Sequence, residues 1–187
     1  MSETTCLTNH FLIAMPALAD PNFAHTVTYI CEHNEKGTMG IVVNRPLDIH
    51  LGEMMNQMKI GDVAEAMDNK QVYLGGPVQQ ELGFVLHNPT GNWESTINVN
   101  DGLAVTTSRD ILTAMAHGQG PDKALVALGY AGWGSGQLER EIAENAWLSG
   151  PADSNIIFHL SAEKRWEAAA ALLGIELQNL SGDIGHA

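Results

Sequence analysis

The segment between Ala124 and Trp147 places the strongest constraint on the fold. It begins with an apolar run, Ala124–Leu128, that is typical of a buried strand. The glycine-rich stretch Gly129–Gly136 predicts a loop, and an amphipathic helix begins near Gln137. Such a loop can build a binding site, because glycines let a partner approach the backbone and the helix start presents unpaired N–H groups. Acidic residues crowd the first helical turns, so the segment predicts a shaped surface rather than a phosphate cradle.

Two familiar motifs fail in this stretch. A nucleophile elbow needs glycine two residues before and two residues after its serine, whereas Ser135 has Trp133 and Gln137 at those positions. A dinucleotide fingerprint needs G-x-G-x-x-G, and here the third glycine comes one residue early. The segment therefore predicts neither a serine hydrolase nor a dinucleotide-binding protein.

The remainder of the chain is rich in short apolar or alternating runs separated by turn residues, which predict strands and hairpins. Helical spacing occurs in several separate places and does not alternate regularly with the strands. We therefore predict an α+β fold, hairpin-rich and mainly antiparallel, in one domain covering residues 1–187. The expected strands are His10–Pro16, Thr26–His33, Met39–Asn44, Gln71–Leu74, Phe84–His87, Ser95–Val99 and Leu103–Thr107.

Three further helices are expected. Leu51, Met54, Met55 and Met58 fall at i, i+3, i+4 and i+7, on one helical face. A methionine stripe can line an adaptable groove, although core packing is the simpler interpretation. Two more helices begin after potential serine caps. They cover Ser108–His117 and the segment from Ser161 to Gly174, where Ala162, Trp166, Ala169, Ala170 and Leu173 form the expected buried stripe, and no regular structure is expected after Asn179.

The charge of the chain argues against nucleic acid. The chain has 9 Lys and Arg and 22 Asp and Glu, which gives a net charge of −13. Affinity for phosphate backbones comes largely from cationic side chains, so no direct nucleic-acid binding is expected. No stretch approaches the ~18 apolar residues of a membrane span, and no secretory signal is visible. Because the two cysteines lie far apart in the sequence, we expect a cytoplasmic protein, without membrane association. Because the histidines are scattered, we expect no metal site, and no motif indicates a cofactor.

Cys31 and His33 are the candidate catalytic pair. Because they lie two apart on an expected strand, they share one face, where the imidazole could activate the thiol as a nucleophile. The alternative is a small buried residue beside a histidine near a turn.

Several irregular segments are the candidate binding residues, because loops on a rigid scaffold commonly carry function. Arg45 could bind a carboxylate of a ligand through bidentate hydrogen bonds, or form an internal ion pair with Glu32, Glu139 or Glu141. Trp133 could dock in the core or in a pocket. The full set is Asn44, Arg45 and Pro46, then Gly75, Gly76 and Pro77, then Trp133 and Gln137.

Four blocks in order resemble the AlgH/YqgE family of bacterial proteins. They are Ala14–Val27, Cys31–Pro46, Tyr73–His87 and Gly129–Leu148, and together they are highly specific. The resemblance implies a compact α+β fold whose sheet curls into a pseudo-barrel. Members are labelled as transcriptional regulators because of a genetic link to alginate production, but the resemblance implies no reaction, cofactor or DNA site.

The leading functional hypothesis is a cytoplasmic regulatory or binding protein that acts through an unknown protein or small-molecule partner. The first alternative is an enzyme using Cys31 as a reactive thiol with His33. Direct DNA binding by a transcriptional regulator ranks last, because the chain is acidic. The oligomeric state cannot be inferred from these patterns.

Overall fold

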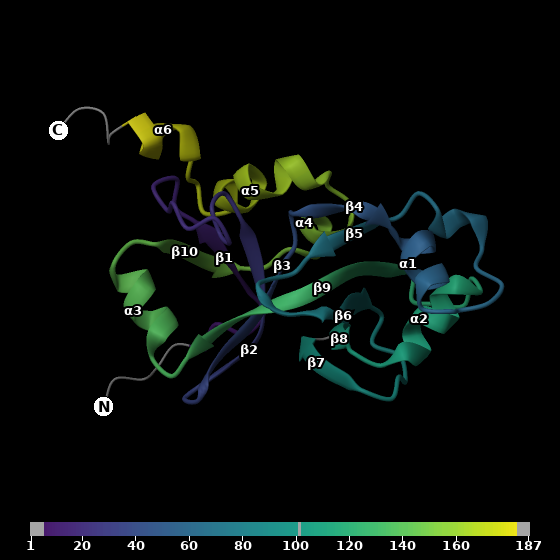
Figure 1. The fold of residues 1–187 in the computed structure, drawn as a ribbon. Helices are drawn as coiled ribbons and strands as arrows, with labels where there is room; N and C mark the ends of the chain where they lie inside the picture. The colour runs from purple at the N-terminus through teal and green to yellow at the C-terminus, as the bar shows by residue number, and fades with distance from the viewer. Residues whose placement is uncertain (1–5, 101, 183–187) are drawn as a thin grey trace. The chain divides into compact units, whose positions relative to one another are not determined.

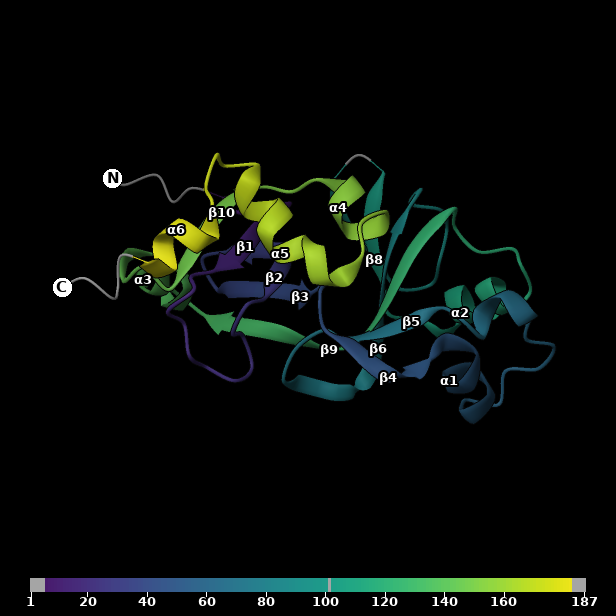
Figure 2. The ribbon, with the colours of Figure 1, turned by 90° about the horizontal axis from the view of Figure 1, so that it is seen from above.

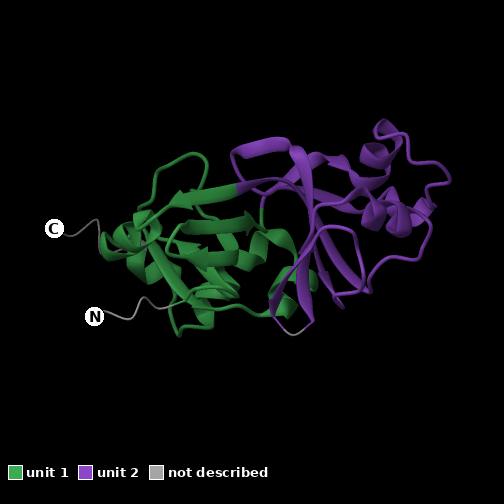
Figure 3. Cartoon of the chain, turned by 90° about the horizontal axis from the view of Figure 1, so that it is seen from below, with its two compact units in different colours: residues 1–44, 131–187 green, residues 45–130 purple. Residues whose placement is uncertain are grey.

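A computed structural model describes residues 6–100 and 102–182. Two compact units emerge (Figure 3). Unit 2 is the continuous segment Arg45–Tyr130, and unit 1 comprises the described residues of Met1–Asn44 and Ala131–Ala187. Each unit has its own buried core. The single domain expected from sequence stays a prediction.

Unit 1 is built on an antiparallel sheet in the order β10-β1-β2-β3-β9. The expected hairpin is confirmed: Thr28 pairs with Val42 at its open end, and Asn34 pairs with Gly37 at its turn. These strands are β1 (His10–Ala14), β2 (Val27–Asn34), β3 (Gly37–Val42), the last four residues of β9 (Lys123–Gly134) and β10 (Trp147–Pro151).

Four helices accompany this sheet, and Figure 1 shows α5 over β1. There the Trp166 indole donates a hydrogen bond to the carbonyl of Ala14, at 2.9 Å. The helices are α3 (Gln137–Ala143), α4 (Ser154–Phe158), α5 (Ala162–Ala171) and α6 (Leu177–Gly182). α6 continues past Asn179, so the expectation of irregular chain there was wrong up to Gly182.

The buried stripe of α5 also differs from expectation. Ala169 and Ala170 are buried as predicted, but Trp166 is only partly buried and Arg165 is buried. Arg165 donates to the carbonyls of Leu160 and Val43, which satisfy its guanidinium inside the unit. Helical spacing alone did not reveal this, because it does not show that the fold brings the carbonyls of Leu160 and Val43 to the guanidinium.

Unit 2 contains strands in the order β4-β5-β9-β6-β8-β7, and β5 with β9 is its parallel pair. Its helices α1 and α2 pack on the apolar face formed by β5, β6 and β9 (Figure 2). The elements are β4 (Pro46–His50), α1 (Leu51–Gln57), the short 3₁₀ helix η1 (Glu65–Met67), β5 (Gln71–Leu74), β6 (Val78–Asn88), β7 (Thr96–Asn100), β8 (Leu103–Thr106), α2 (Arg109–Ala116) and the first eight residues of β9.

The glycine-rich loop expected at Gly129–Gly136 was mostly wrong, because β9 continues as a strand to Gly134. The glycines do not interrupt pairing: Gly132 lies opposite Met39 and Gly134 opposite Gly37. A side chain at Gly37 would collide with the carbonyl of Trp133, so small residues allow this close pairing. Only the short turn before Gln137 remains of the expected loop.

The α+β class is confirmed, with curled, mainly antiparallel β-structure and flanking helices. The helix expected from the methionine stripe is α1, and the strand Gln71–Leu74 is β5. No helix within residues 6–100 and 102–182 combines the length and apolar character that a bilayer span requires.

Candidate functional site

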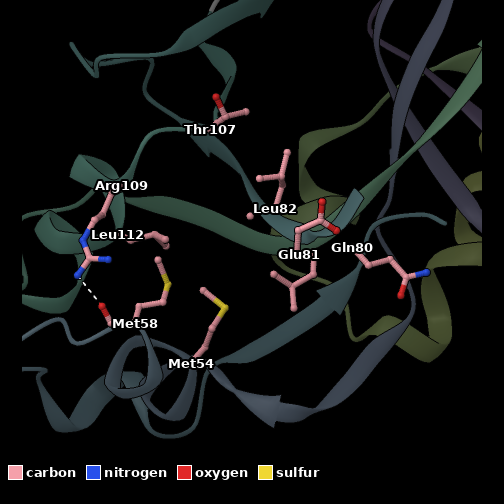
Figure 4. A pocket seen from close by; sticks show the side chains of 10 residues that line it. Met54, Met58, Gln80, Glu81, Leu82, Thr107, Arg109 and Leu112 are labelled. Carbon is pink, nitrogen blue, oxygen red and sulfur yellow. Dashed lines mark hydrogen bonds between the residues drawn. The ribbon is translucent and has the colours of Figure 1, made fainter. Parts of the chain in front are cut away.

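A pocket of about 360 Å³ in unit 2 is a candidate site (Figure 4). We call it the methionine pocket. Its wall on one side comes from α1 and α2, and on the other from the first half of β6. Its lining residues are Met54, Met58, Gln80, Glu81, Leu82, Gly83, Thr107, Arg109, Leu112 and Leu128. A mainly apolar pocket with a few polar groups at its margin is typical of small-molecule sites.

The β6 wall exists because the strand bulges away from β9. Val78 pairs with Tyr130 and Gly83 pairs with Leu128, so four residues of β6 lie opposite Gly129 alone. Gly129 has φ of +79°, and a Cβ there would lie 2.5 Å from the carbonyl oxygen of Gly76. Only glycine allows this backbone crossing without displacement.

The bulge presents Leu82 to solvent, with 45% of its surface exposed. Glu81 beside it is also exposed. Figure 4 shows the side chains of both on the β6 side of the pocket, opposite Met54, Met58 and Leu112. An exposed leucine at the edge of an apolar pocket enlarges the apolar surface that a ligand can cover.

The helical wall carries the cation of the site. Arg109 is the first residue of α2, and its Nη2 donates to the carbonyl oxygen of Met58 at 2.6 Å. Arg109 makes no ion pair with any described acid. The neighbouring Asp110 carboxylate instead accepts from Ser108 Oγ and from the backbone N–H groups of Glu94 and Ile111. Desolvation raises the pKa of Asp110, but the hydrogen bonds together outweigh it and keep the pKa below its usual value.

Cys31 is buried, with 2% of its surface exposed. Its thiol contacts the carbonyl of Tyr29 at 3.7 Å, and burial raises its pKa well above the ordinary value. No hydrogen bond joins it to His33 among the contacts of the described chain. A nucleophilic thiol needs a thiolate and access, so this geometry does not support catalysis by Cys31.

His33 is also committed to structural contacts. Its Nδ1 accepts from the backbone N–H of Leu7 at 2.9 Å, so the proton lies on Nε2 and is donated to Glu139 at 2.6 Å. This hydrogen bond is the main reason that the pKa of Glu139 is lowered. With both ring nitrogens occupied, His33 has no free lone pair for general-base catalysis.

Trp133 and Gln137 meet at a different acid, Glu141. Its Oε1 accepts from the indole N–H groups of Trp133 and Trp147, at 3.3 and 3.0 Å, and its Oε2 accepts from Gln137 Nε2 at 3.0 Å. Trp133 is 5% exposed and stacks on Phe23, with ring centroids 5.7 Å apart. Trp133 is therefore a core anchor, which was one of the two expectations.

The remaining candidates are divided between the units. In unit 1, Asn44 accepts from the N–H of Val27 and donates to the carbonyl of His25, which fixes the end of the β2–β3 hairpin. In unit 2, the chain at Arg45 and Pro46 lies beside the start of the Gly75–Gly76–Pro77 turn, because the N–H of Leu74 donates to the carbonyl of Arg45. Pro46 and Pro77 are exposed, whereas Gly75 and Gly76 are buried.

Sequence reasoning missed most of the methionine pocket. The methionine stripe indicates Met54 and Met58 as a possible groove, but Thr107 and Arg109 carry no local signal. The available signal was an apolar residue before Gly83 in an otherwise polar run, Gln79–Glu81. No group of three or more metal-binding side chains occurs in the described chain.

Comparison with known proteins gives a consistent family. The family described as AlgH-like matches residues 11–178. A UPF0301 protein from Nitrosococcus oceani is 59% identical over 99% of this chain and all of its own length, and one from Thioalkalivibrio sulfidiphilus is 58% identical over the full length of both.

Two solved structures have similar folds. The solution structure of the AlgH protein from Pseudomonas aeruginosa has a TM-score of 0.81 and 51% identity, covering 100% of this chain and 99% of the other. A crystal structure of a protein from Corynebacterium diphtheriae has a TM-score of 0.75 over 97% and 94% of the two chains, and at 19% identity it shows the shared fold alone. The chain therefore belongs to the AlgH-like, UPF0301 family.

Proposed function

We propose that this protein is a binding protein whose methionine pocket takes up the apolar part of a small ligand. The observation that carries the proposal is the open apolar pocket bounded by the β6 bulge, with Leu82 exposed at its margin. Methionine side chains are flexible and polarizable, so such a wall adapts to ligands of different shape. Regulation would follow from occupancy of this pocket.

The rival hypotheses have less support. An enzyme acting through Cys31 would require an accessible thiol, and the thiol is buried. Direct DNA binding would require a basic surface in a chain with a net charge of −13. A cytoplasmic location is part of the proposal and is supported by the two free thiols of Cys6 and Cys31, which suit a reducing compartment.

The test uses Nile red, an uncharged dye whose emission rises in apolar surroundings. A Cβ added at Gly83 meets nothing within 4 Å, so Gly83→Leu should fill the pocket without a backbone clash. Gly61→Leu is the matched control, because Gly61 has equally open surroundings and does not line the pocket. We expect the wild type and Gly61→Leu to bind the dye, and Gly83→Leu to bind at least several-fold more weakly. Equal binding by all three proteins would refute the proposal.

A further inference from the structure

The charges on the two walls of the methionine pocket differ in sign. Arg109 lies at the edge of the helical wall, and Glu81 lies on the β6 wall. The apolar residues Met54, Met58 and Leu112 line the helical side. A ligand with one charged end therefore has two distinguishable orientations, and the preferred one depends on which wall offers the better-placed partner.

Arg109 is the better-placed partner. Its hydrogen bond to the Met58 carbonyl uses one of five guanidinium N–H donors and holds the side chain against α1. The other donors form no hydrogen bond with a described residue, and the nearby Asp110 carboxylate is engaged by Ser108, Glu94 and Ile111. A held guanidinium with free donors suits a carboxylate, which it can bind through two parallel hydrogen bonds.

Glu81 lacks comparable support. Both side chains are exposed, but Glu81, unlike Arg109, has no hydrogen bond or ion pair to a described residue that would hold it in one position. An exposed, unrestrained carboxylate gains little from a single ion pair, because solvent screens the attraction and ordering the side chain costs entropy. Glu81 is therefore the weaker partner for a charged end, and its negative charge adds a small, screened repulsion against an anionic group on the β6 wall.

We infer that the ligand of the methionine pocket is a small amphipathic carboxylate, with its apolar chain against Met54, Met58 and Leu112 and its carboxylate on Arg109. This inference rests on the proposed binding function of the same pocket. The volume of about 360 Å³ lies at the lower end of the range for small-molecule sites, which favours a ligand with a short apolar chain.

The experiment compares octanoate, 1-octanol and octylamine, which share a chain length and differ in head-group charge. The protein carries ¹³C-methyl methionine. The sequence has eight methionines, and the assigned signals of Met54 and Met58 report occupancy relative to the rest. We expect all binding probes to shift these two signals. Octanoate should bind roughly fivefold more tightly than 1-octanol at low salt, as expected for one partly exposed ion pair.

Substitutions separate the role of Arg109 from net charge. Arg109→Gln should remove the preference for octanoate and leave 1-octanol affinity nearly unchanged, and Glu81→Gln should strengthen octanoate binding. Lys123→Gln is the matched control, because it removes the same charge from unit 2 and does not line the pocket. The preference for octanoate should also decrease as the ionic strength rises to about 1 M, where the Debye length is only about 3 Å and ion pairs are strongly screened.

The outcomes distinguish the inference from the proposed function. If 1-octanol and octanoate bind equally at the Met54 and Met58 signals, or if octylamine binds best, the carboxylate inference is wrong and the binding function stands. If no probe shifts these signals, both are wrong. If the signals instead change on dilution of the protein alone, a second copy of the chain covers the pocket, and both are also overturned.

Discussion

Replacing Trp133 by alanine tests whether the end of β9 depends on its aromatic anchor. The ring is 5% exposed, so truncation loses nearly its full transfer free energy and leaves a cavity. Large-to-small replacements of buried tryptophan cost about 3–5 kcal/mol. Contacts with Phe23 and Trp147, at centroid distances of 5.7 and 5.9 Å, place the expected loss in the upper half of that range, about 4–5 kcal/mol.

The loss of the indole N–H contributes little to this total. Its hydrogen bond to Glu141 is long, at 3.3 Å, and Glu141 keeps its bonds from Trp147 and Gln137 after the substitution. Trp133→Phe should therefore cost less, about 1–2 kcal/mol, because an aromatic ring still fills most of the space. The two variants separate the contribution of packing from that of the hydrogen bond.

Urea unfolding followed by far-ultraviolet circular dichroism measures both variants without relying on tryptophan fluorescence. Leu172→Ala is the control, because Leu172 is 48% exposed and its truncation should change the free energy of unfolding by less than about 0.5 kcal/mol. A loss below about 1 kcal/mol for Trp133→Ala, with an unchanged denaturant slope, would refute the assignment of Trp133 as a core anchor.

Four further predictions concern single groups and the charge of the chain. Gly129→Ala should destabilise the protein by more than about 2 kcal/mol, because it combines a left-handed φ with a backbone clash. Gly118→Ala is the control: with φ of +76° and open surroundings, it should cost only the conformational strain of about 1 kcal/mol. Equal losses of unfolding free energy in urea would contradict this. Burial lowers the pKa of His87, so on acidification the unfolded state binds a proton before the folded state does. The free energy of unfolding should therefore decrease as the pH is lowered from about 6.5, by at most about 1.4 kcal/mol per pH unit. A difference between wild type and His87→Gln that does not vary with pH in urea titrations would exclude this linkage. In native protein, iodoacetamide should alkylate exposed Cys6 and spare buried Cys31, as peptide mass spectrometry can show; rapid modification of Cys31 would restore the enzyme hypothesis. Fluorescence anisotropy should detect no sub-micromolar binding of duplex DNA near physiological salt, and steeply salt-dependent binding would reverse that expectation.

The parts of the fold that depend on local pattern were predictable. β-Branched and aromatic residues beside a short polar turn located the β2–β3 hairpin, and i, i+3, i+4 spacing located α1. The continuation of β9 through its glycines was not predictable, because glycine is a weak strand former and only pairing with β3 extends the strand. Strand β10 was missed for the same reason: its partner, β1, lies more than 100 residues earlier.

The sites were less predictable than the fold. His33 was expected to act on Cys31, two residues away, but its partner is Glu139, 106 residues along the chain. The methionine pocket combines Met58, Leu82 and Arg109 from three separate elements, and no single segment carries its signature. Sequence spacing identifies neighbours within one strand or helix, whereas these contacts depend on how elements pack together.

The division of β9 between the units has a consequence for the order in which the protein can mature. Unit 2 is continuous, from Arg45 to Tyr130, so a ribosome delivers all of it before it delivers the last four residues of β9, α3 or β10. During that interval, β3 has only β2 as a partner strand, and β1 lacks β10. Exposed strand edges invite pairing with other chains. The 86 residues of unit 2 are therefore synthesised between the β2–β3 hairpin and its later partner strand. The rate at which unit 2 is translated sets how long the edges of the hairpin stay unpaired.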